Sequence, residues 1–531
     1  MDMELSRNLI QRVCVGDMIR RRASAMPNAT AVAEKRNDAV LYCTYKALNE
    51  QMNQFVYAAR KAGLKKGDRV GILGLNSTEY ITVLFGCAKG GIVAVPINPG
   101  LNPADIVYII NHAKIKLLLV DDMLFRLLEA IKGGLPAGIK IIAIPATGQP
   151  LPTDTTRFAD FISGFPTTEV EDVIIEDRDT FEILYTSGTT AKPKGVVVSH
   201  LSVFIASLST IIEFRLPPCV TSTLLLPIFH CAQQTMTMGT LHIGGTAVVF
   251  RGFDSTQMLE TIEREAIEAM LCLPQMYRAM LDHPRIGTTN LASVKVCCYA
   301  MTPMDQRTLE NAIRIFSKAE FMLGTGQTEF FPSTNTFRNA WQLTKKGNYW
   351  GESALTVDTA IMDNNGRLLP QGEVGEIVWR GPAAMAEYLD NPEATAESRQ
   401  FGWHHSGDIG FFDEDGQLAF VDRKKDIIKT GGENVPSIKV ERVILADPRV
   451  ASVAVVGLPH PRWIECVTAF VVPAKDAVLT EEDIIDICNR ELGRFEVPKK
   501  VLIVDELPTT STGKLRKNVL RDQHKGIYAP E

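Results

Sequence analysis

The segment ILYTSGTTAKPKGVVVSH at residues 183–200 joins two apolar runs, each with the composition of a buried β-strand. Between these runs lie several hydroxyl residues, the glycines Gly188 and Gly195, and the lysines Lys192 and Lys194. Glycine has no Cβ and tolerates positive φ, so such a loop can bring its backbone N–H groups close to an anion. The segment therefore predicts a phosphate-binding loop between two strands, with an ordinary hydrophilic hairpin as the alternative.

The loop is not a P-loop of the GxxxxGK[ST] kind. Gly195 follows Lys194 directly and valines follow Gly195, so the helix N-terminus on which that motif depends is absent. Side-chain donors would come from the hydroxyl residues of the loop. These are Thr186, Ser187, Thr189 and Thr190.

Outward from this segment, short β-rich runs alternate with helical patterns. The run RVGILGL begins at residue 69 and is followed by STEYITVLFGCAKGG, IVAVPIN and KIKLLLVDD; beyond residue 200 the strands TAVVFRGF, EAMLCLP, VKVCCYA and EFMLGTG continue the pattern. This alternation is typical of mostly parallel, helix-covered sheets, which bind ligands at the carboxyl ends of their strands. The sequence therefore predicts an α/β fold.

The pattern changes after about residue 345, where Asn-Gly and other Gly-rich turns separate short alternating strands, as in an antiparallel β subdomain. A charged stretch, VDRKKDIIKTGG, then precedes three apolar runs interleaved with the helical pattern TEEDIIDICNREL. We therefore expect a large N-terminal domain at residues 1–424 and a small α+β domain at residues 425–531.

Composition excludes several classes of protein. The chain has 531 residues, of which 45% are hydrophobic, so it can bury a sizeable core in more than one domain. The net charge of −6 and the absence of a long basic run argue against a nucleic-acid partner. Ten scattered cysteines without a CxxC motif indicate neither disulfides nor zinc, and no run approaches the roughly 18 apolar residues of a membrane span. We expect a cytoplasmic protein with no transmembrane segment and a small-molecule partner.

The string YTSGTTAKPKGVVVSH resembles the AMP-binding signature of the acyl-adenylate-forming superfamily. Further motifs follow in the family's order, so the resemblance covers essentially the whole chain, and it is to the acyl-CoA synthetase/ligase branch. It implies that the N-terminal domain binds a carboxylate and ATP through Lys194 and the hydroxyl residues of the loop. It also implies that the C-terminal domain is a mobile lid carrying a catalytic lysine.

The stretch LGTGQTE at residues 323–329 resembles the family's second nucleotide motif. The resemblance implies that Thr328 holds a phosphate oxygen and that Glu329 orders Mg²⁺, which prefers hard oxygen ligands; taken alone, Glu329 would be a surface acid. Thr325 stands where many relatives carry an aromatic residue near the adenine. The nucleotide-binding residues implied here are Gly324, Thr325, Gly326, Gln327 and Thr328.

Two further motifs bear on the nucleotide. HHSGDIG at residues 404–410 resembles the motif whose aspartate, here Asp408, accepts hydrogen bonds from both ribose hydroxyls, because a carboxylate has two acceptor oxygens. Its alternative role is that of a turn-capping aspartate. Arg423 would hold the ribose and phosphate side. CYAMTPM at residues 298–304 occupies the place of the adenine-lining segment, with Thr302 assigned to it.

The C-terminal motifs concern the lid. TGGENVP at residues 430–436 resembles the loop that lines the pantetheine channel, which assigns Gly431, Gly432 and Glu433 to CoA. PTTSTGKLRK at residues 508–517 resembles the motif of the catalytic lysine, here Lys514. The family's hinge position matches Lys425, which would absorb the rotation of the lid between the two half-reactions.

LPIFHCAQQT at residues 226–235 resembles the segment beside the acyl site. His230 either closes the path between the acyl carboxylate and the thiol, or is a core histidine at a strand end. The sequence Ser199-His200 is typical of strand termination rather than of a nucleophile pair. The catalytic residues implied by the resemblance are Thr186, His230, Glu329 and Lys514.

The expected function is that of an acyl-CoA ligase, which converts a carboxylic acid, ATP and CoA to acyl-CoA, AMP and pyrophosphate through an acyl-adenylate. We expect Mg²⁺ as a cofactor and a medium-chain, cyclic, aromatic or carnitine-like acid as the substrate, with a role in fatty acid metabolism and a homodimer as in relatives. The alternatives are an adenylating enzyme that loads the phosphopantetheine of a carrier protein, and a nucleotide-binding pseudoenzyme.

Overall fold

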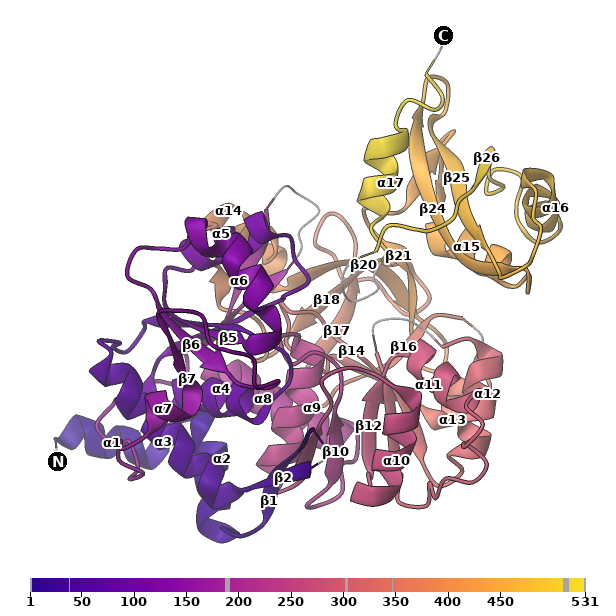
Figure 1. The fold of residues 1–531 in the computed structure, drawn as a ribbon. Coiled ribbons are helices and arrows are strands. Elements are labelled where there is room, and N and C mark those ends of the chain that lie inside the picture. The colour runs from indigo at the N-terminus through magenta and orange to yellow at the C-terminus, as the bar shows by residue number, and fades with distance from the viewer. Residues whose placement is uncertain are drawn as a thin grey trace. The chain divides into compact units, whose positions relative to one another are not determined.

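The structure is a computed structural model that describes residues 2–37, 39–186, 192–300, 304–345, 347–509 and 515–529. The chain forms two compact units (Figure 1). The first unit consists of Met1–Thr359 and Trp379–His404, and the second of Ala360–Val378 and His405–Glu531. The single boundary between residues 424 and 425 stays a prediction.

One sheet of the first unit contains both strands of the opening segment. Its strands lie in the order β19-β9-β8-β4-β3-β5-β6-β7, and all neighbours from β8 to β7 are parallel, whereas β9 is antiparallel to both β8 and β19. The strands are β3 (Arg69–Leu73), β4 (Val93–Ile97), β5 (Ile115–Asp121), β6 (Lys140–Ile144), β7 (Thr155–Arg157), β8 (Thr180–Thr186), β9 (Lys194–Ser199) and β19 (Glu387–Tyr388).

The second sheet of this unit has the order β16-β15-β14-β13-β12-β10-β11-β1-β2. Its strands from β14 to β1 are parallel, and β15, β16 and β2 are antiparallel to their neighbours. The strands are β1 (Thr30–Arg36), β2 (Ala39–Thr44), β10 (Thr221–Leu224), β11 (Thr246–Val249), β12 (Ala269–Cys272), β13 (Val296–Tyr299), β14 (Glu320–Thr325), β15 (Asn335–Arg338) and β16 (Tyr349–Ser353).

Helices cover both sheets, which explains why the central strands are continuous apolar runs rather than alternating ones. In one core cluster, α10 and α12 pack on β12 to β14 (Figure 1), and in another, α5 and α6 pack on β3 to β5. The α-helices are α1 (Met3–Gln11), α2 (Gly16–Ala25), α3 (Tyr45–Lys61), α4 (Thr78–Gly90), α5 (Pro103–His112), α6 (Phe125–Ile131), α7 (Phe158–Ile162), α8 (His200–Glu213), α9 (Cys231–His242), α10 (Ser255–Glu265), α11 (Pro274–Leu281), α12 (Gln306–Ile315), α13 (Asn339–Gln342) and α14 (Pro392–Glu397). The short 3-10 helices are η1 (Asp122–Leu124), η2 (Lys132–Gly134) and η3 (Gln400–Gly402).

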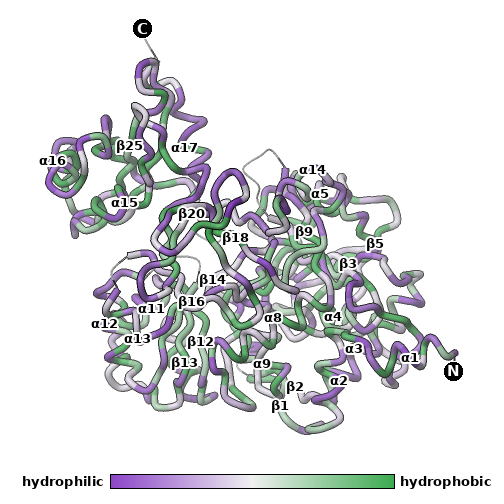
Figure 2. The backbone as a smooth tube through the Cα atoms, turned by 180° about the vertical axis from the view of Figure 1, so that it is seen from behind, coloured by the Kyte–Doolittle hydropathy of each residue, from purple (hydrophilic) through white to green (hydrophobic). Residues whose placement is uncertain are grey.

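The second unit combines an antiparallel β region with an α+β region. The hairpin of β20 and β21 belongs to the first of these, and a sheet in the order β23-β22-β25-β24, with β26 beside β25, belongs to the second. Figure 2 shows β25 as largely hydrophobic and α17 as largely hydrophilic. The elements are β17 (Asp358–Met362), β18 (Gly375–Arg380), β20 (His404–Phe412), β21 (Leu418–Arg423), β22 (Ile428–Thr430), β23 (Glu433–Val435), α15 (Ser437–Leu445), β24 (Val450–His460), β25 (Ile464–Pro473), α16 (Glu481–Glu491), β26 (Lys500–Ile503) and α17 (Lys517–His524).

Among the residues that the structure describes, none of the helices combines the length and the apolar character that a membrane span needs.

A buried ammonium group ties α4 to α3 in the first unit. The side chain of Lys89 is 0% exposed, and its Nζ donates to Asn49 Oδ1 at 2.8 Å, Asn53 Oδ1 at 2.6 Å and Glu169 Oε2 at 2.6 Å. Burial lowers the pKa of Lys89, and Glu169 opposes this effect. The cation is thus matched by one carboxylate and two amide oxygens, as a buried charge requires.

We expect Lys89→Met to lower the free energy of unfolding by about 2–4 kcal/mol, because it leaves a carboxylate and two amide oxygens without their donor. Urea unfolding of the variant and the wild type measures the difference. Lys116→Met is the matched control: Lys116 pairs with Asp68 but is 56% exposed, so its removal should cost less than about 1 kcal/mol. Equal losses in the two variants would contradict the prediction.

Candidate active site

The two apolar runs of the opening segment form strands, as predicted, with β8 ending at Thr186 and β9 beginning at Lys194. The two strands also pair with each other as a hairpin. Thr186 and Lys194 are directly opposite each other in the antiparallel register. The loop residues Ser187, Gly188, Thr189 and Thr190 lie outside the described residues. The segment is therefore a strand–loop–strand unit with a lysine at its base, and phosphate binding by the loop stays a prediction.

Tyr388, which the sequence analysis did not single out, joins this hairpin to the second nucleotide motif. It lies on β19, opposite Val196 of β9. Its hydroxyl donates to Glu329 Oε1 at 2.9 Å, and Lys194 Nζ lies 4.9 Å from the centroid of its ring. Burial and the adjacent Glu329 raise the pKa of Tyr388, which keeps the phenol protonated as a donor. A lysine, a phenol and a carboxylate from three distant segments thus form one polar group.

The second motif also contacts the start of α9. Cys231, the first residue of α9, has its Sγ 3.8 Å from Thr328 Oγ1. His230 is the N-cap residue of this helix, and its Nε2 is buried without a hydrogen-bond partner among the described residues. Burial lowers the pKa of His230 to about 4, so the imidazole is neutral at physiological pH. A neutral imidazole suits both roles considered for His230, that of a gate and that of a core residue.

The glycines of the second motif are required by close packing. A Cβ at Gly324 would lie 2.6 Å from Phe214 Cζ, and a Cβ at Gly326 would lie 2.8 Å from Pro332 Cβ. Thr325 Oγ1 lies 3.3 Å from both Thr334 Oγ1 and the carbonyl oxygen of Asn335. Gln327 closes a tight turn in which the amides and carbonyls of residues 327 and 330 pair. The motif is thus a compact turn that follows β14 and presents Thr328 and Glu329.

In the second unit, the residues expected at the ribose form a cross-strand pair. Asp408 on β20 is opposite Arg423 on β21, and Arg423 Nε lies 3.5 Å from Asp408 Oδ1. Asp408 is only 4% exposed. Lys425, the expected hinge residue, follows β21, and burial lowers its pKa. The pairing of a carboxylate with a guanidinium is chemically apt for binding a diol, but ribose binding stays a prediction.

Gly431 and Gly432 form the turn of the hairpin between β22 and β23. Thr430 pairs with Glu433 across it, and the two glycines have φ values of 60° and 92°. A two-residue turn with positive φ at both positions favours glycine strongly. The amide of Gly431 donates to the carbonyl oxygen of Trp463 at 3.0 Å. The glycines are therefore explained by the turn itself, and their role towards CoA stays a prediction.

Thr302 and Lys514 lie outside the described residues. The segment around Lys514 is flanked by an antiparallel bridge between Thr509 and Leu515. Lys517, at the start of α17, has its Nζ 2.6 Å from Ser437 Oγ and 2.8 Å from Glu441 Oε1. The position of the helix that follows the lysine motif is therefore tied to α15.

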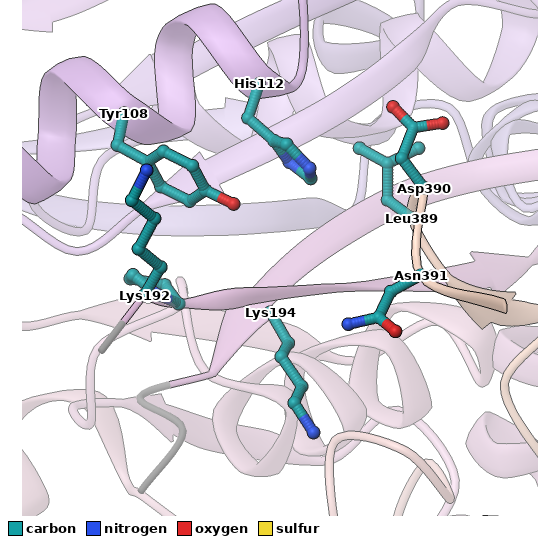
Figure 3. A pocket seen from close by; sticks show the side chains of 8 residues that line it. Tyr108, His112, Lys192, Lys194, Leu389, Asp390 and Asn391 are labelled. Atoms are coloured by element: carbon teal, nitrogen blue, oxygen red, sulfur yellow. The ribbon is translucent and has the colours of Figure 1, made fainter. Parts of the chain in front are cut away.

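A cavity of about 360 Å³ borders the hairpin of β8 and β9 (Figure 3). Tyr108 and His112 of α5 line one side of it, and His112 Nδ1 lies 2.7 Å from the hydroxyl of Tyr185 on β8. Lys192 Nζ lies 5.0 Å from the centroid of the Tyr108 ring. The remaining lining residues are Pro193, Lys194, Leu389, Asp390 and Asn391. Residues that flank the predicted phosphate loop therefore line an open cavity of mixed polar and apolar character.

The structure also bears on two other kinds of site, a nucleophile pair at Ser199-His200 and a metal site. Ser199 Oγ accepts from the amide of Ser202 as the N-cap of α8, and His200 is fully buried with its Nδ1 accepting from the amide of Val15, so the pair ends a strand and begins a helix. Within the described ranges, no three His, Cys, Asp or Glu side chains gather in a way that could hold a metal ion. A metal at Glu329 would therefore need ligands from the substrate or from water.

Comparison with known proteins assigns the family. The model of the AMP-binding enzyme family matches residues 19–389, and the model of the AMP-binding enzyme C-terminal domain matches residues 439–514. The chain therefore belongs to the AMP-binding enzyme family. This confirms both the resemblance to acyl-adenylate-forming enzymes and the α/β fold class.

Two curated relatives and one solved structure show how far the similarity extends. A feruloyl-CoA synthase from Amycolatopsis sp is 32% identical over 506 residues, which cover 94% of this chain and 97% of the relative. A fatty acid–[acyl-carrier-protein] ligase, ScoC, from Streptomyces coeruleorubidus is 32% identical over 500 residues, 92% of each chain. The structure of ATP-bound MatB from Rhodopseudomonas palustris has a TM-score of 0.84 at 26% identity and covers 97% of this chain and 99% of its own.

We expect Tyr388→Phe to weaken ATP binding by about tenfold, because a hydrogen bond to a charged carboxylate contributes about 1.5 kcal/mol and its loss frees Glu329 to turn. Isothermal titration calorimetry measures the dissociation constant. Tyr42→Phe is the matched control, since the Tyr42 hydroxyl contacts the Glu265 carboxylate at an exposed position of β2. Unchanged affinity in Tyr388→Phe would remove Tyr388 from the nucleotide site.

Proposed function

We propose that this protein is an AMP-forming acyl-CoA ligase. A carboxylate is a poor acyl donor because oxide is a poor leaving group. In the proposed reaction the carboxylate attacks the α-phosphorus of ATP, which forms acyl-AMP and releases pyrophosphate. The thiolate of CoA then attacks the acyl carbon and AMP leaves, which forms the thioester.

The observation that carries the proposal is the contact of Tyr388 with both nucleotide motifs. Lys194, at the base of the signature loop, lies over the ring of Tyr388, and Glu329, at the end of the second motif, accepts a hydrogen bond from its hydroxyl. Phosphoryl transfer needs fixed positive charge and oriented donors rather than a protein nucleophile. This group offers a cation and a correctly held carboxylate, and membership of a family whose substrates include ATP and CoA supports the same reaction.

Glu329 fits the requirements of Mg²⁺. Mg²⁺ in enzymes that act on nucleotides is usually held by one or two carboxylates together with phosphate oxygens and water. Glu329 supplies one such carboxylate, oriented by Tyr388, and no dense cluster of ligands surrounds it among the described residues. When bound, Mg²⁺ would neutralise phosphate charge; the role of this chain is to hold the carboxylate in place.

The remaining roles are assigned from the motifs. Thr186, Thr328 and the residues of the loop would bind phosphate oxygens, Asp408 and Arg423 the ribose, and Gly431 to Glu433 the pantetheine chain of CoA. Lys514 would neutralise the junction between carboxylate and phosphate during adenylation. Because Lys514 and Gly431 would serve different half-reactions, we propose that residues 425–531 rotate about Lys425 between them.

The identities of the acyl acceptor and of the acid substrate distinguish the candidate functions. The name of ScoC says that this relative joins a fatty acid to an acyl carrier protein. The similarity to ScoC therefore makes carrier loading the second candidate function. We propose CoA as the acceptor and a medium-chain, cyclic, aromatic or carnitine-like acid as the substrate. A cytoplasmic homodimer active in fatty acid metabolism completes the proposal.

A panel of carboxylic acids tests the proposal directly. The purified protein is mixed with ATP, Mg²⁺ and each acid in turn, and AMP release is measured with and without CoA. We expect at least one acid to give AMP release that CoA accelerates in the absence of any carrier protein. Release that depends instead on an added phosphopantetheinylated carrier would favour the second candidate, and no release with any acid would favour a pseudoenzyme.

We expect Lys514→Ala to lower the rate of adenylation by about 10²–10³-fold, because removal of one preorganised charge typically costs about 3–4 kcal/mol of transition-state stabilisation. Acid-dependent ATP–pyrophosphate exchange measures this step. Thioester formation from synthetic acyl-AMP and CoA serves as the internal control and should survive. Equal loss of both half-reactions would show that the lysine is misassigned.

A further inference from the structure

A carboxyl group is buried in the middle of β8, and none of the ion pairs of the described residues includes it. Glu182 and Gln234 of α9 are both 0% exposed, and Gln234 Nε2 donates to Glu182 Oε2 at 3.0 Å. The other oxygens of the pair, Glu182 Oε1 and Gln234 Oε1, are buried with no hydrogen-bond partner among the described residues. Among the described residues, the hydrogen bond between Gln234 and Glu182 is therefore the one that each of these two side chains makes.

The surroundings of Glu182 favour its neutral form. Its strand neighbours are Ala94 on β4 and Val198 on β9, which cannot titrate. The titratable groups that face it are the Tyr80 hydroxyl of α4 and the Cys231 thiol of α9, and burial raises the pKa of both, so neither is charged at neutral pH. Burial also raises the pKa of Glu182 to about 8, and only the hydrogen bond from Gln234 opposes this shift. An ionised carboxylate here would be desolvated without a counter-charge.

The protonated form also matches the hydrogen-bonding groups that the pair leaves unpaired. A carboxylic acid has one O–H donor and one free acceptor, and a carboxamide has the complementary N–H and C=O. Glu182 Oε2 accepts from Gln234 Nε2, and a proton on Oε1 would give the acid the donor that the unpaired Gln234 Oε1 requires. An ionised carboxylate has no donor, so it would leave the amide oxygen unsatisfied, at a cost typical of a buried unpaired polar atom.

The pair lies where two parts of the proposed active site meet. Four residues beyond Glu182, β8 ends at Thr186 at the base of the signature loop. Gln234 belongs to the first turn of α9, and its backbone N–H donates to the carbonyl oxygen of His230 at 3.1 Å. The same turn carries Cys231, which contacts Thr328 of the second motif. The contact between Glu182 and Gln234 therefore fixes the first turn of α9 against the signature strand.

We propose that Glu182 is a positioning residue, a neutral carboxylic acid whose pairing with Gln234 holds His230 and Cys231 in register with the signature strand, and whose ionisation in alkaline solution releases that turn. The expected consequence is a pH-sensitive rate of adenylation that Glu182 controls without touching a substrate.

The rate test rests on the proposed ligase activity. Acid-dependent ATP–pyrophosphate exchange is measured from pH 6.5 to 9.5 for the wild type and for Glu182→Gln, in which the amide copies the donor and acceptor of the protonated acid. The assay contains no CoA, so thiol ionisation does not contribute. At pH 6.5 the two rates should be similar, and at pH 9 the ratio of variant to wild type should rise by about tenfold, because a group of pKa near 8 is then nine-tenths ionised.

Two further variants separate positioning from a general effect of mutation. Glu182→Leu should be slow at every pH, since it lacks both hydrogen bonds, so Glu182→Gln acts as its rescue. Glu268→Gln is the matched control: Glu268 pairs with Lys295 at the surface, and its rate ratio to the wild type should be constant with pH. A constant ratio for Glu182→Gln, or a loss equal to that of Glu182→Leu, would overturn the proposal.

Stability provides a readout that does not depend on activity. The folded pKa of Glu182 is raised, so its contribution to stability is complete below the unfolded value of about 4.3 and is lost as the pH rises through about 8. The thermal midpoint of the wild type, relative to that of Glu182→Gln, should therefore fall between pH 5 and pH 9. If no acid is activated but this fall is observed, the ligase proposal fails while the proposal of a neutral Glu182–Gln234 pair stands. A difference in thermal midpoint that is constant with pH would overturn the proposal of a neutral pair.

Infrared difference spectroscopy of the wild type covers the case in which Glu182→Gln does not fold. Between pH 7 and pH 9 the spectrum should lose the carbonyl band of a buried protonated carboxylic acid. No change in that band would overturn the proposal.

Discussion

The pairing of β9 with strands on both of its sides is the constraint on which the candidate site depends. Hydrogen bonds to β8 place Lys194 opposite Thr186, and hydrogen bonds to β19 place Tyr388 beside the same strand. The Tyr388 hydroxyl donates to Glu329, which follows β14, a strand of the other sheet of this unit. Backbone ladders are rigid because every buried N–H and C=O must be paired. The sheet therefore fixes the positions of Lys194 and Tyr388, and the hydrogen bond from Tyr388 adds Glu329 to the group.

Buried ionisable groups in the first unit are satisfied in two different ways. Lys89 stays paired with Glu169 and two amide oxygens, so its charge is retained within a complete set of acceptors. Within the described part of the chain Glu182 contacts a single amide and no cation, so burial favours its neutral form. Both arrangements follow from the cost of desolvating charge. The first joins two helices, whereas the second joins a helix to the strand that leads into the signature loop.

Much of the candidate site could be predicted from motifs because its chemistry depends on local backbone. Gly431 and Gly432 take positive φ in a two-residue turn, and Gly324 and Gly326 leave no room for a Cβ. All four residues were assigned through the resemblance of their motifs to those of the family. Tyr388 could not be found in this way. It is 59 positions from Glu329 along the chain, and a single tyrosine before a turn carries no distinctive local signal.

The sequence by itself determined the α/β class, the family and the order of the motifs, since hydrophobic period and turn chemistry act over a few residues. Only the tertiary structure decided which side chains meet. In the sequence Glu182 is one polar residue within an apolar strand. Its neutral form is favoured by the contact with Gln234 and by burial away from water, and neither can be predicted from the residues next to it in the chain. Contacts between distant segments depend on how sheets and helices pack, and that packing sets the burial on which pKa depends.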